Sequence, residues 1–259
     1  ADIIAMQVFS RGDVETHDGF DVCGVGNAPC VFSYSSDQML AMEQALSLNE
    51  SEGGSLKVAS VNMSLGGGQY YDFCDANSAA YAGVLNNLLD ANIAVVIATG
   101  NNGWSDSING PGCYSTAVSV ASTTKTDRIS SFSNIASGLV DVAAPGSSIA
   151  SAVLDDNFAY KNGTSMATPH VAGAWALMRE ALDDGSATPV DVILDALKLT
   201  ATNVPLRENG TDTGFGVARI NIAAASESVV PTFVVTPSAT GNGSFSPDTA
   251  QNVAENETA

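Results

Sequence analysis

The stretch from Asn162 to Gly173 constrains this chain more than any other, because it leads from a tight turn directly into an apolar helix. Gly163 has no β-carbon, which lets the backbone come close to a ligand, and Ser165 follows in the first turn of the predicted helix. The hydroxyl of Ser165 is therefore held near the positive end of a helix dipole. Taken alone, Ser165 is either an ordinary capping residue or a nucleophile on a rigid support.

The predicted elements alternate between strands and helices along the chain. Apolar segments of strand or helix character lie at residues 3–9 (strand), 36–48 (helix), 58–65 (strand), 76–90 (helix), 93–98 (strand) and 188–199 (helix). The helix after Ser165 is expected to bury Val171, Ala172, Ala174, Trp175, Leu177, Met178 and Leu182. This alternation predicts an α/β fold with a mainly parallel central sheet and helices on both faces. Ligands of such sheets bind beyond the carboxyl ends of the strands.

Two glycine-containing segments lie where predicted strands end, at the edge of the sheet where ligands are expected. They are Val61–Gly68 and Ala98–Gly103. In an arbitrary protein each would be a strand followed by a turn, since glycine and asparagine are common turn residues.

Together, the three segments resemble the motifs of subtilisin-like serine proteases (subtilases), in the order in which that family carries them. The run from Gly163 to Gly173 matches the nucleophile motif almost letter for letter. The resemblance implies a subtilisin-like fold over residues 1–226, with Ser165 as nucleophile. It implies that the amide of Asn101 stabilises the oxygen that becomes anionic when the serine attacks. It also implies a substrate-binding set made of Ser64, Leu65, Gly66, Ala98, Thr99 and Gly100.

The catalytic base of a subtilase is missing from this sequence. A serine hydroxyl needs a His to take its proton and an Asp to orient that His, and in this family both precede the serine. His170 follows Ser165 in the same helix, where subtilases carry a structural His, and His17 lies in a polar loop without the family context. We therefore interpret the chain as an amino-terminally truncated catalytic domain, and we expect it to be inactive alone.

Three functions fit this pattern. The first is a secreted subtilisin-like serine endopeptidase that acts through an acyl-enzyme on Ser165, with the Asp and His supplied by the parent protein. The second is a non-catalytic subtilase fold that serves as a binding or scaffold protein. The third is a relative that passes the acyl group to an amine. Intact Ser165 and Asn101 favour the first, because a non-catalytic homologue has no chemical need for either.

The four cysteines lack the spacing and the accompanying histidines of a zinc site. Two disulfides, Cys23–Cys30 and Cys74–Cys113, fit an oxidising compartment, although four cysteines allow three pairings and free buried thiols are the alternative.

The composition narrows the possible partners. The net charge of −19 argues against nucleic acid and anionic membranes, and no apolar run is long enough to span a bilayer. We expect polypeptide substrates, a monomer, secretion to the extracellular medium and a propeptide in the parent. The chemistry requires no cofactor. Structural Ca²⁺ is implied by the family resemblance only, because no complete ligand set is matched.

The composition shifts near residue 227. Pro231–Pro237 alternates like a strand, and turn residues follow at Gly241–Ser244. Residues 227–259 are therefore either a linker and the start of a β-rich accessory module or a disordered tail.

Overall fold

A central sheet of six strands organises the described part of the computed structural model. The strands lie in the order β13 (Thr202–Leu206), β14 (Asp212–Arg219), β10 (Val142–Pro145), β9 (Val118–Thr123), β7 (Ala94–Ala98) and β5 (Ser60–Met63). Neighbouring strands run parallel except β13 and β14, which are antiparallel. The structure describes residues 2–13, 16–17, 20–21, 23, 26–50, 56–182, 187–229, 232–235 and 251–254.

Strand β7 shows why the sheet is covered on both faces. All five of its residues are buried. Ala94 and Val96 belong to one hydrophobic cluster, and Val95 and Ile97 belong to another. Because successive side chains of a strand point to opposite faces, an entirely apolar strand requires a layer of helices on each side.

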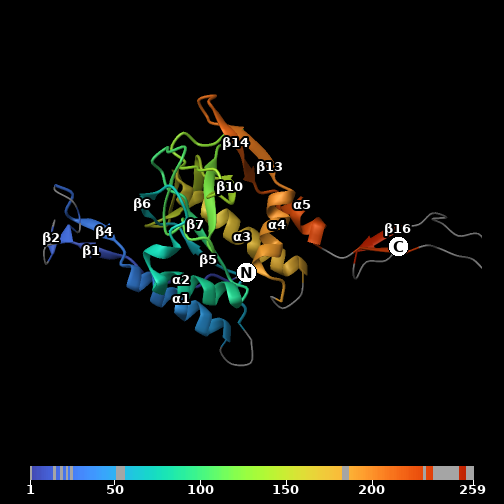
Figure 1. The fold of residues 1–259 in the computed structure, drawn as a ribbon, viewed down its shortest axis with the longest axis horizontal. Coiled ribbons are helices and arrows are strands. Elements are labelled where there is room, and N and C mark those ends of the chain that lie inside the picture. Colours follow the sequence, from blue (N-terminus) through green and yellow to red (C-terminus); the bar gives the residue numbers. More distant parts are fainter. Residues whose placement is uncertain are drawn as a thin grey trace, which may run out of the picture.

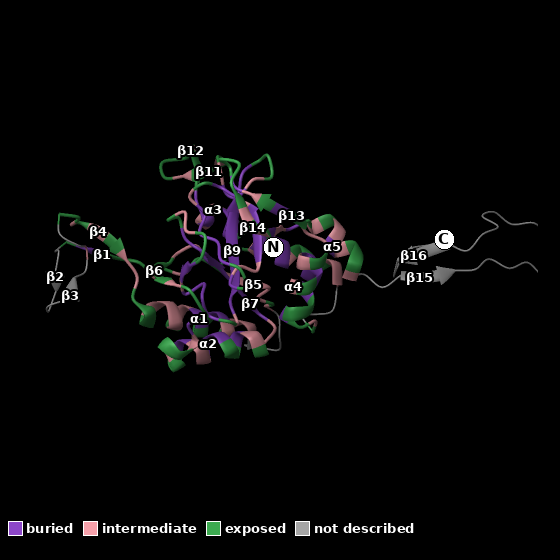
Figure 2. Ribbon diagram, turned by 45° about the horizontal axis from the view of Figure 1, so that its top comes forward, coloured by how far each residue is buried: buried purple, intermediate pink, exposed green. Residues whose placement is uncertain are grey.

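Two sets of helices supply these layers. Helices α3 (Thr164–Leu182), α4 (Val190–Leu199) and α5 (Ile222–Val229) pack on the face of Val96. Helices α1 (Ser35–Glu50) and α2 (Ala79–Asp90) cover the face of Ile97 (Figure 1). Figure 2 shows the buried residues concentrated in the central strands and on the inner sides of these helices. The predicted fold class is confirmed.

Smaller elements surround this core. A 3-10 turn at Asp75–Asn77 precedes α2. The two-stranded sheets pair β1 (Ser10–Gly12) with β4 (Cys30–Phe32), β2 (Thr16–His17) with β3 (Phe20–Asp21), β6 (Gly67–Tyr70) with β8 (Ile108–Gly110), β11 (Ile149–Val153) with β12 (Asn157–Lys161), and β15 (Thr232–Val235) with β16 (Gln251–Ala254). The last pair lies in the carboxyl-terminal region where a β-rich module or a tail was expected. The predicted turn at residues 241–244 lies outside the described residues.

Two expectations about apolar residues are wrong. Residues 3–9 form no strand, and Ile3 is 94% exposed. A strand requires a neighbouring strand that shares its backbone hydrogen bonds, and no described strand pairs with residues 3–9. Leu177 of α3 is exposed, because it lies outside the stripe formed by Val171, Ala174 and Met178 at helical spacing.

Both expected disulfides are present. Cys23 is bonded to Cys30 and Cys74 to Cys113, each pair with its Cα atoms 5.4 Å apart. The second bond ties the segment before α2 to the loop after β8, where Cys74 also donates a backbone hydrogen bond to Cys113.

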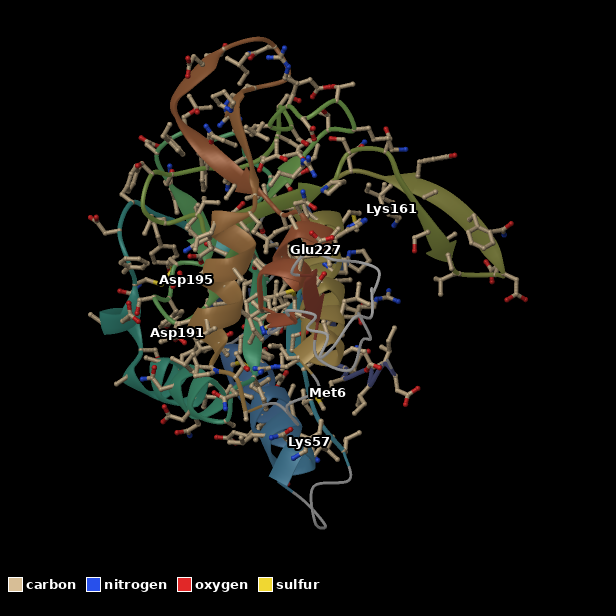
Figure 3. All side chains as sticks on the ribbon, turned by 90° about the vertical axis from the view of Figure 1, so that its right-hand side faces the viewer. Met6, Lys57, Lys161, Asp191, Asp195 and Glu227 are labelled. Atoms are coloured by element: carbon tan, nitrogen blue, oxygen red, sulfur yellow. A yellow bond between two sulfur atoms is a disulfide. The ribbon has the colours of Figure 1, made fainter. Side chains whose placement is uncertain are left out.

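Acidic side chains lie on the outer surface of the helices. Asp191 and Asp195 are one turn apart on the exposed side of α4, and Glu227 lies on α5 (Figure 3). None of the helices in the described part of the chain has the length and apolar character needed to cross a membrane.

Candidate active site

Ser165 lies at the amino-terminal end of α3 and is bound to the segment that follows β5. Its Oγ donates a hydrogen bond to the backbone oxygen of Ser64 at 3.1 Å. In return, Oγ of Ser64 donates to the backbone oxygen of Ser165 at 2.8 Å. These reciprocal bonds hold the first turn of α3 against the carboxyl end of the sheet. Ser165 itself is half-buried, so its hydroxyl remains within reach of a ligand.

The side chain of Asn101 is oriented by the residue before Ser165. Its Oδ1 accepts hydrogen bonds from the backbone N–H of Thr164 at 2.8 Å and from the Thr164 hydroxyl at 3.0 Å. A backbone N–H can only donate, so the atom that faces it is the amide oxygen. The Nδ2 group therefore points away from Thr164 and lies beside Gly163, 3.5 Å from where a β-carbon on that glycine would be.

Thr164 connects the two catalytic candidates. It is fully buried, and its hydroxyl accepts a hydrogen bond from the backbone N–H of Gly100 at 3.1 Å while donating to Asn101. The loop after β7 and the start of α3 are thus held together next to Ser165. The side-chain amide of Asn101 has its two N–H groups available for a ligand oxygen in the cleft.

A cleft of about 550 Å³ extends from Ser165 between these segments. The predicted site residues that line it are Ser64, Leu65, Gly66, Ala98, Gly100, Asn101 and Ser165. The structure therefore brings together three segments that lie far apart in the sequence. Thr99 does not line the cleft, because its side chain is fully buried and donates to the backbone oxygen of Asn134 at 2.9 Å.

Several lining residues were not identified from the sequence. The remaining walls come from the β1–β4 region, the starts of α1, β6 and α3, and the end of β8. Their residues are Phe9, Val31, Phe32, Ser33, Gln38, Gly67, Asn109, Gly110, Pro111 and Thr164. The turn residues at Asn109–Pro111 were a usable signal, since they follow the same loop. The others carry no local pattern that distinguishes a cleft wall from a surface.

Neither histidine is seen to act on Ser165. His170 is exposed on α3, and its Nδ1 is hydrogen bonded to the backbone oxygen of Met166 at 2.8 Å. The side chain of His17 lies outside the described residues. The hydroxyl of Ser165 donates to a carbonyl oxygen, which cannot take its proton as a base does. Among the described side chains, the cleft thus contains the hydroxyl of Ser165 and the amide of Asn101, with no base bonded to that hydroxyl.

Metal ligands are not grouped in the described residues, where no three His, Cys, Asp or Glu side chains are placed to hold an ion together. The structural calcium implied by the resemblance stays a prediction, because backbone carbonyls also bind Ca²⁺.

Comparison with known proteins agrees with this geometry. The model of the subtilase family matches residues 30–218. The chain is 36% identical over 161 residues to a thermophilic serine proteinase of Bacillus sp. (strain AK1), with 62% of this chain and 36% of that protein aligned. It is 37% identical over 148 residues to subtilisin BL of Lederbergia lenta, with 57% of this chain and 51% of that protein aligned.

A solved structure shares the fold. The prenylagaramide maturation protease PagA superposes with a TM-score of 0.61 at 24% identity, covering 77% of this chain and 70% of that one. The chain spans about half or less of the length of the two curated relatives. The family match over most of the chain, on a fold and a cleft of this kind, shows that the chain belongs to the subtilase family.

Proposed function

We propose that this chain is the nucleophile-bearing part of a secreted serine endopeptidase, with Ser165 as the attacking residue. The observation that carries the proposal is that Ser165 and Asn101 line the same cleft. Nδ2 of Asn101 and the backbone nitrogen of Ser165 lie 3.5 Å and 3.6 Å from the same point, where a β-carbon on Gly163 would be. The disulfides support secretion, because such bonds persist in oxidising compartments.

The chemistry assigns one role to each group. Oγ of Ser165 attacks the carbonyl carbon of the scissile peptide bond, and its proton passes to a His that an Asp orients. The Nδ2 group of Asn101 donates to the oxygen that becomes anionic, so it binds the transition state more tightly than the substrate. The leaving amine takes the proton from the His, and water then hydrolyses the acyl-enzyme. The His and the Asp are proposed to lie in the protein outside these 259 residues.

The substrate is proposed to bind as an extended strand along Ser64–Gly66, which leads out of the end of β5. A peptide that pairs with such a segment gains backbone hydrogen bonds, while pockets beside it select side chains. The small walls of the cleft at Gly66, Ala98 and Gly100 favour a large apolar residue before the cut. A monomeric state, a propeptide and structural Ca²⁺ belong to the same proposal.

The experiment compares this chain with the longer protein that includes the upstream Asp and His motifs. We expect the purified chain to release no product from casein or a chromogenic peptide, and the longer protein to hydrolyse both. In the longer protein, Ser165→Ala is expected to lower kcat by about 10⁶-fold, and Asn101→Ala by roughly a hundred- to a thousandfold, as for the corresponding groups of a subtilisin.

Two outcomes contradict the proposal. Hydrolysis by the chain alone that Ser165→Ala abolishes would show that the chain supplies its own base. A folded longer protein without any hydrolysis would favour the scaffold function instead. Thermal unfolding of each variant serves as the control for folding.

A further inference from the structure

Asn134 belongs to the loop that joins β9 to β10, and it forms several hydrogen bonds with the loop that carries Asn101. Its side chain is fully buried. Its Oδ1 accepts from the backbone N–H groups of Asn102 at 2.8 Å and Trp104 at 3.2 Å. Its Nδ2 donates to the backbone oxygen of Thr99 at 3.1 Å and to Oδ1 of Asn102 at 3.2 Å. One side chain thus holds the backbone on both sides of Asn101.

The backbone of Asn134 adds two further bonds to the same loop. Its N–H donates to the oxygen of Gly100 at 3.0 Å, and its oxygen accepts from the Thr99 hydroxyl at 2.9 Å. The hydrogen-bonding groups of Asn134 are therefore directed at residues 99–104. A buried polar group with this many partners in one loop fixes the conformation of that loop.

Arg207 anchors the far end of the loop. Its Nη2 donates to the backbone oxygen of Trp104 at 2.7 Å, and its Nη1 donates to the backbone oxygen of Ser133 at 3.2 Å. Arg207 is buried, with 6% of the residue exposed, and this burial lowers the pKa of its guanidinium. The residue before Asn134 and the end of the loop are thus bound to one rigid group from the β13–β14 region.

Asn101 needs this support because its own attachment is limited. The residue is exposed, and its side chain is held through Oδ1 by Thr164. An oxyanion donor stabilises a transition state only if it is fixed in place before the reaction, since reorientation during the reaction costs free energy.

We propose that Asn134 is the positioning residue of the oxyanion donor. By binding Thr99, Gly100, Asn102 and Trp104, it presets the backbone from which the amide of Asn101 reaches the cleft. This inference rests on the proposed function, because it requires Asn101 to donate to the substrate oxygen.

The main experiment is a double-mutant cycle in the longer protein that hydrolyses peptides. Asn134→Ala is expected to lower kcat by about 10²-fold with little change in KM, the size of effect that a misplaced catalytic group produces. Asn101→Ala lowers kcat as well, and the double variant is expected to be no slower than Asn101→Ala. Effects that do not add show that the two residues act as one unit.

Ser119→Ala is the matched control. Ser119 is also fully buried, and its hydroxyl donates to the backbone oxygen of Leu139 and bonds to Asp141, away from the cleft. It is expected to lower the thermal midpoint and leave kcat unchanged. A loss of kcat in this control as large as that in Asn134→Ala would overturn the inference, because general destabilisation would explain both.

Asn134→Asp tests the mechanism in case Asn134→Ala fails to fold. The introduced carboxyl keeps the acceptor for Asn102 and Trp104, but it can donate to the oxygen of Thr99 only when it is protonated. The kcat of Asn134→Asp, divided by the kcat of the unsubstituted protein, is therefore expected to fall as pH rises. The same ratio for Ser119→Ala is expected to stay constant. A ratio that does not change over a pH range in which the introduced carboxyl is shown by NMR to ionise would overturn the inference.

The remaining outcomes separate this inference from the proposed function. If Asn101→Ala leaves kcat unchanged, Asn101 is not the oxyanion donor, and both the proposed role of Asn101 and the positioning inference are wrong. If Asn101→Ala lowers kcat and Asn134→Ala does not, or if their effects add fully, the positioning role alone is overturned.

In the 259-residue chain, Asn134→Ala is expected to speed amide hydrogen exchange in residues 99–104, a readout that needs no activity.

Discussion

Gly100 occupies a position that no other residue fits without displacing its neighbours. Its φ is +105°, in the region that residues with a side chain rarely adopt. A β-carbon built there would lie 1.8 Å from Oδ1 of Asn109 and 2.4 Å from Nδ2 of Asn134. The close approach of this backbone to Asn134 is what allows the hydrogen bonds around Asn101 to form.

The residue-scale prediction is that Gly100→Ala destabilises the chain and disturbs the loop. We expect a loss of about 2 kcal/mol in the free energy of unfolding, from backbone strain and displacement of the two amides. Denaturation in urea, followed by circular dichroism, measures it.

Gly173→Ala is the control for this substitution. Nothing lies within 4 Å of the β-carbon that this glycine of α3 would gain, so we expect a gain of about 0.5–1 kcal/mol. If both substitutions change the free energy of unfolding equally, the neighbours of Gly100 accommodate a β-carbon without destabilising the chain, and the prediction is wrong.

At the scale of elements, the layer of α1 and α2 depends on a buried tyrosine. The hydroxyl of Tyr81 on α2 donates to Oε1 of Gln38 on α1 at 2.7 Å. Its ring stacks on Tyr114, with centroids 5.0 Å apart. Burial raises the pKa of Tyr81, and the nearby Tyr114 raises it further. Gln38 also lines the cleft, so this contact connects helix packing to the site.

This raised pKa predicts a loss of stability in alkali. Unfolded tyrosine has a pKa of about 10, so below that pH the contribution of Tyr81 is fully present. Above it the unfolded chain loses a proton that the folded chain keeps, and the free energy of unfolding falls as pH rises toward the folded pKa.

Tyr81→Phe checks this prediction by urea denaturation between neutral pH and pH 11. It is expected to cost about 1 kcal/mol near neutrality, through the lost hydrogen bond, and to reduce the fall in stability above pH 10. Tyr160→Phe, which changes an exposed tyrosine of β12, is the control. The prediction is wrong if both variants lose stability in alkali with the unsubstituted slope.

At the scale of the whole molecule, like charges dominate. The chain carries 28 acidic and 9 basic residues, which gives the net charge of −19. The ion pairs in the described ranges include Lys198–Asp141, Arg219–Asp127 and the exposed Arg11–Asp13. Repulsion among the remaining carboxylates opposes the compact state, and dissolved salt screens it.

We therefore expect the thermal midpoint to rise as NaCl increases from about 0.05 to about 0.5 M, where the screening length falls below 10 Å. Differential scanning fluorimetry at a fixed pH measures this. A midpoint that falls with NaCl would mean that the few ion pairs outweigh the repulsion.

Local patterns were enough to predict much of the framework. The helix at residues 36–48 is found as α1 and the strand at 93–98 as β7, because apolar spacing and turn residues act within a few positions of the elements they define. The apolar run at 3–9 failed for the opposite reason, since a strand depends on a partner that its own residues do not specify.

By itself, the sequence determined the turn at Gly163, the helix after Ser165 and the identity of the family motifs, since these depend on neighbouring residues. Only the tertiary structure decided which groups meet. Asn101 reaches Thr164 across 63 positions, and Asn134 reaches Asn102 across 32. The tertiary structure also placed the side chain of Thr99 in the interior, where it bonds to Asn134, and not in the wall of the cleft. Such contacts form because the parallel strands end at one edge of the sheet, and no local pattern records which side chains that edge brings together.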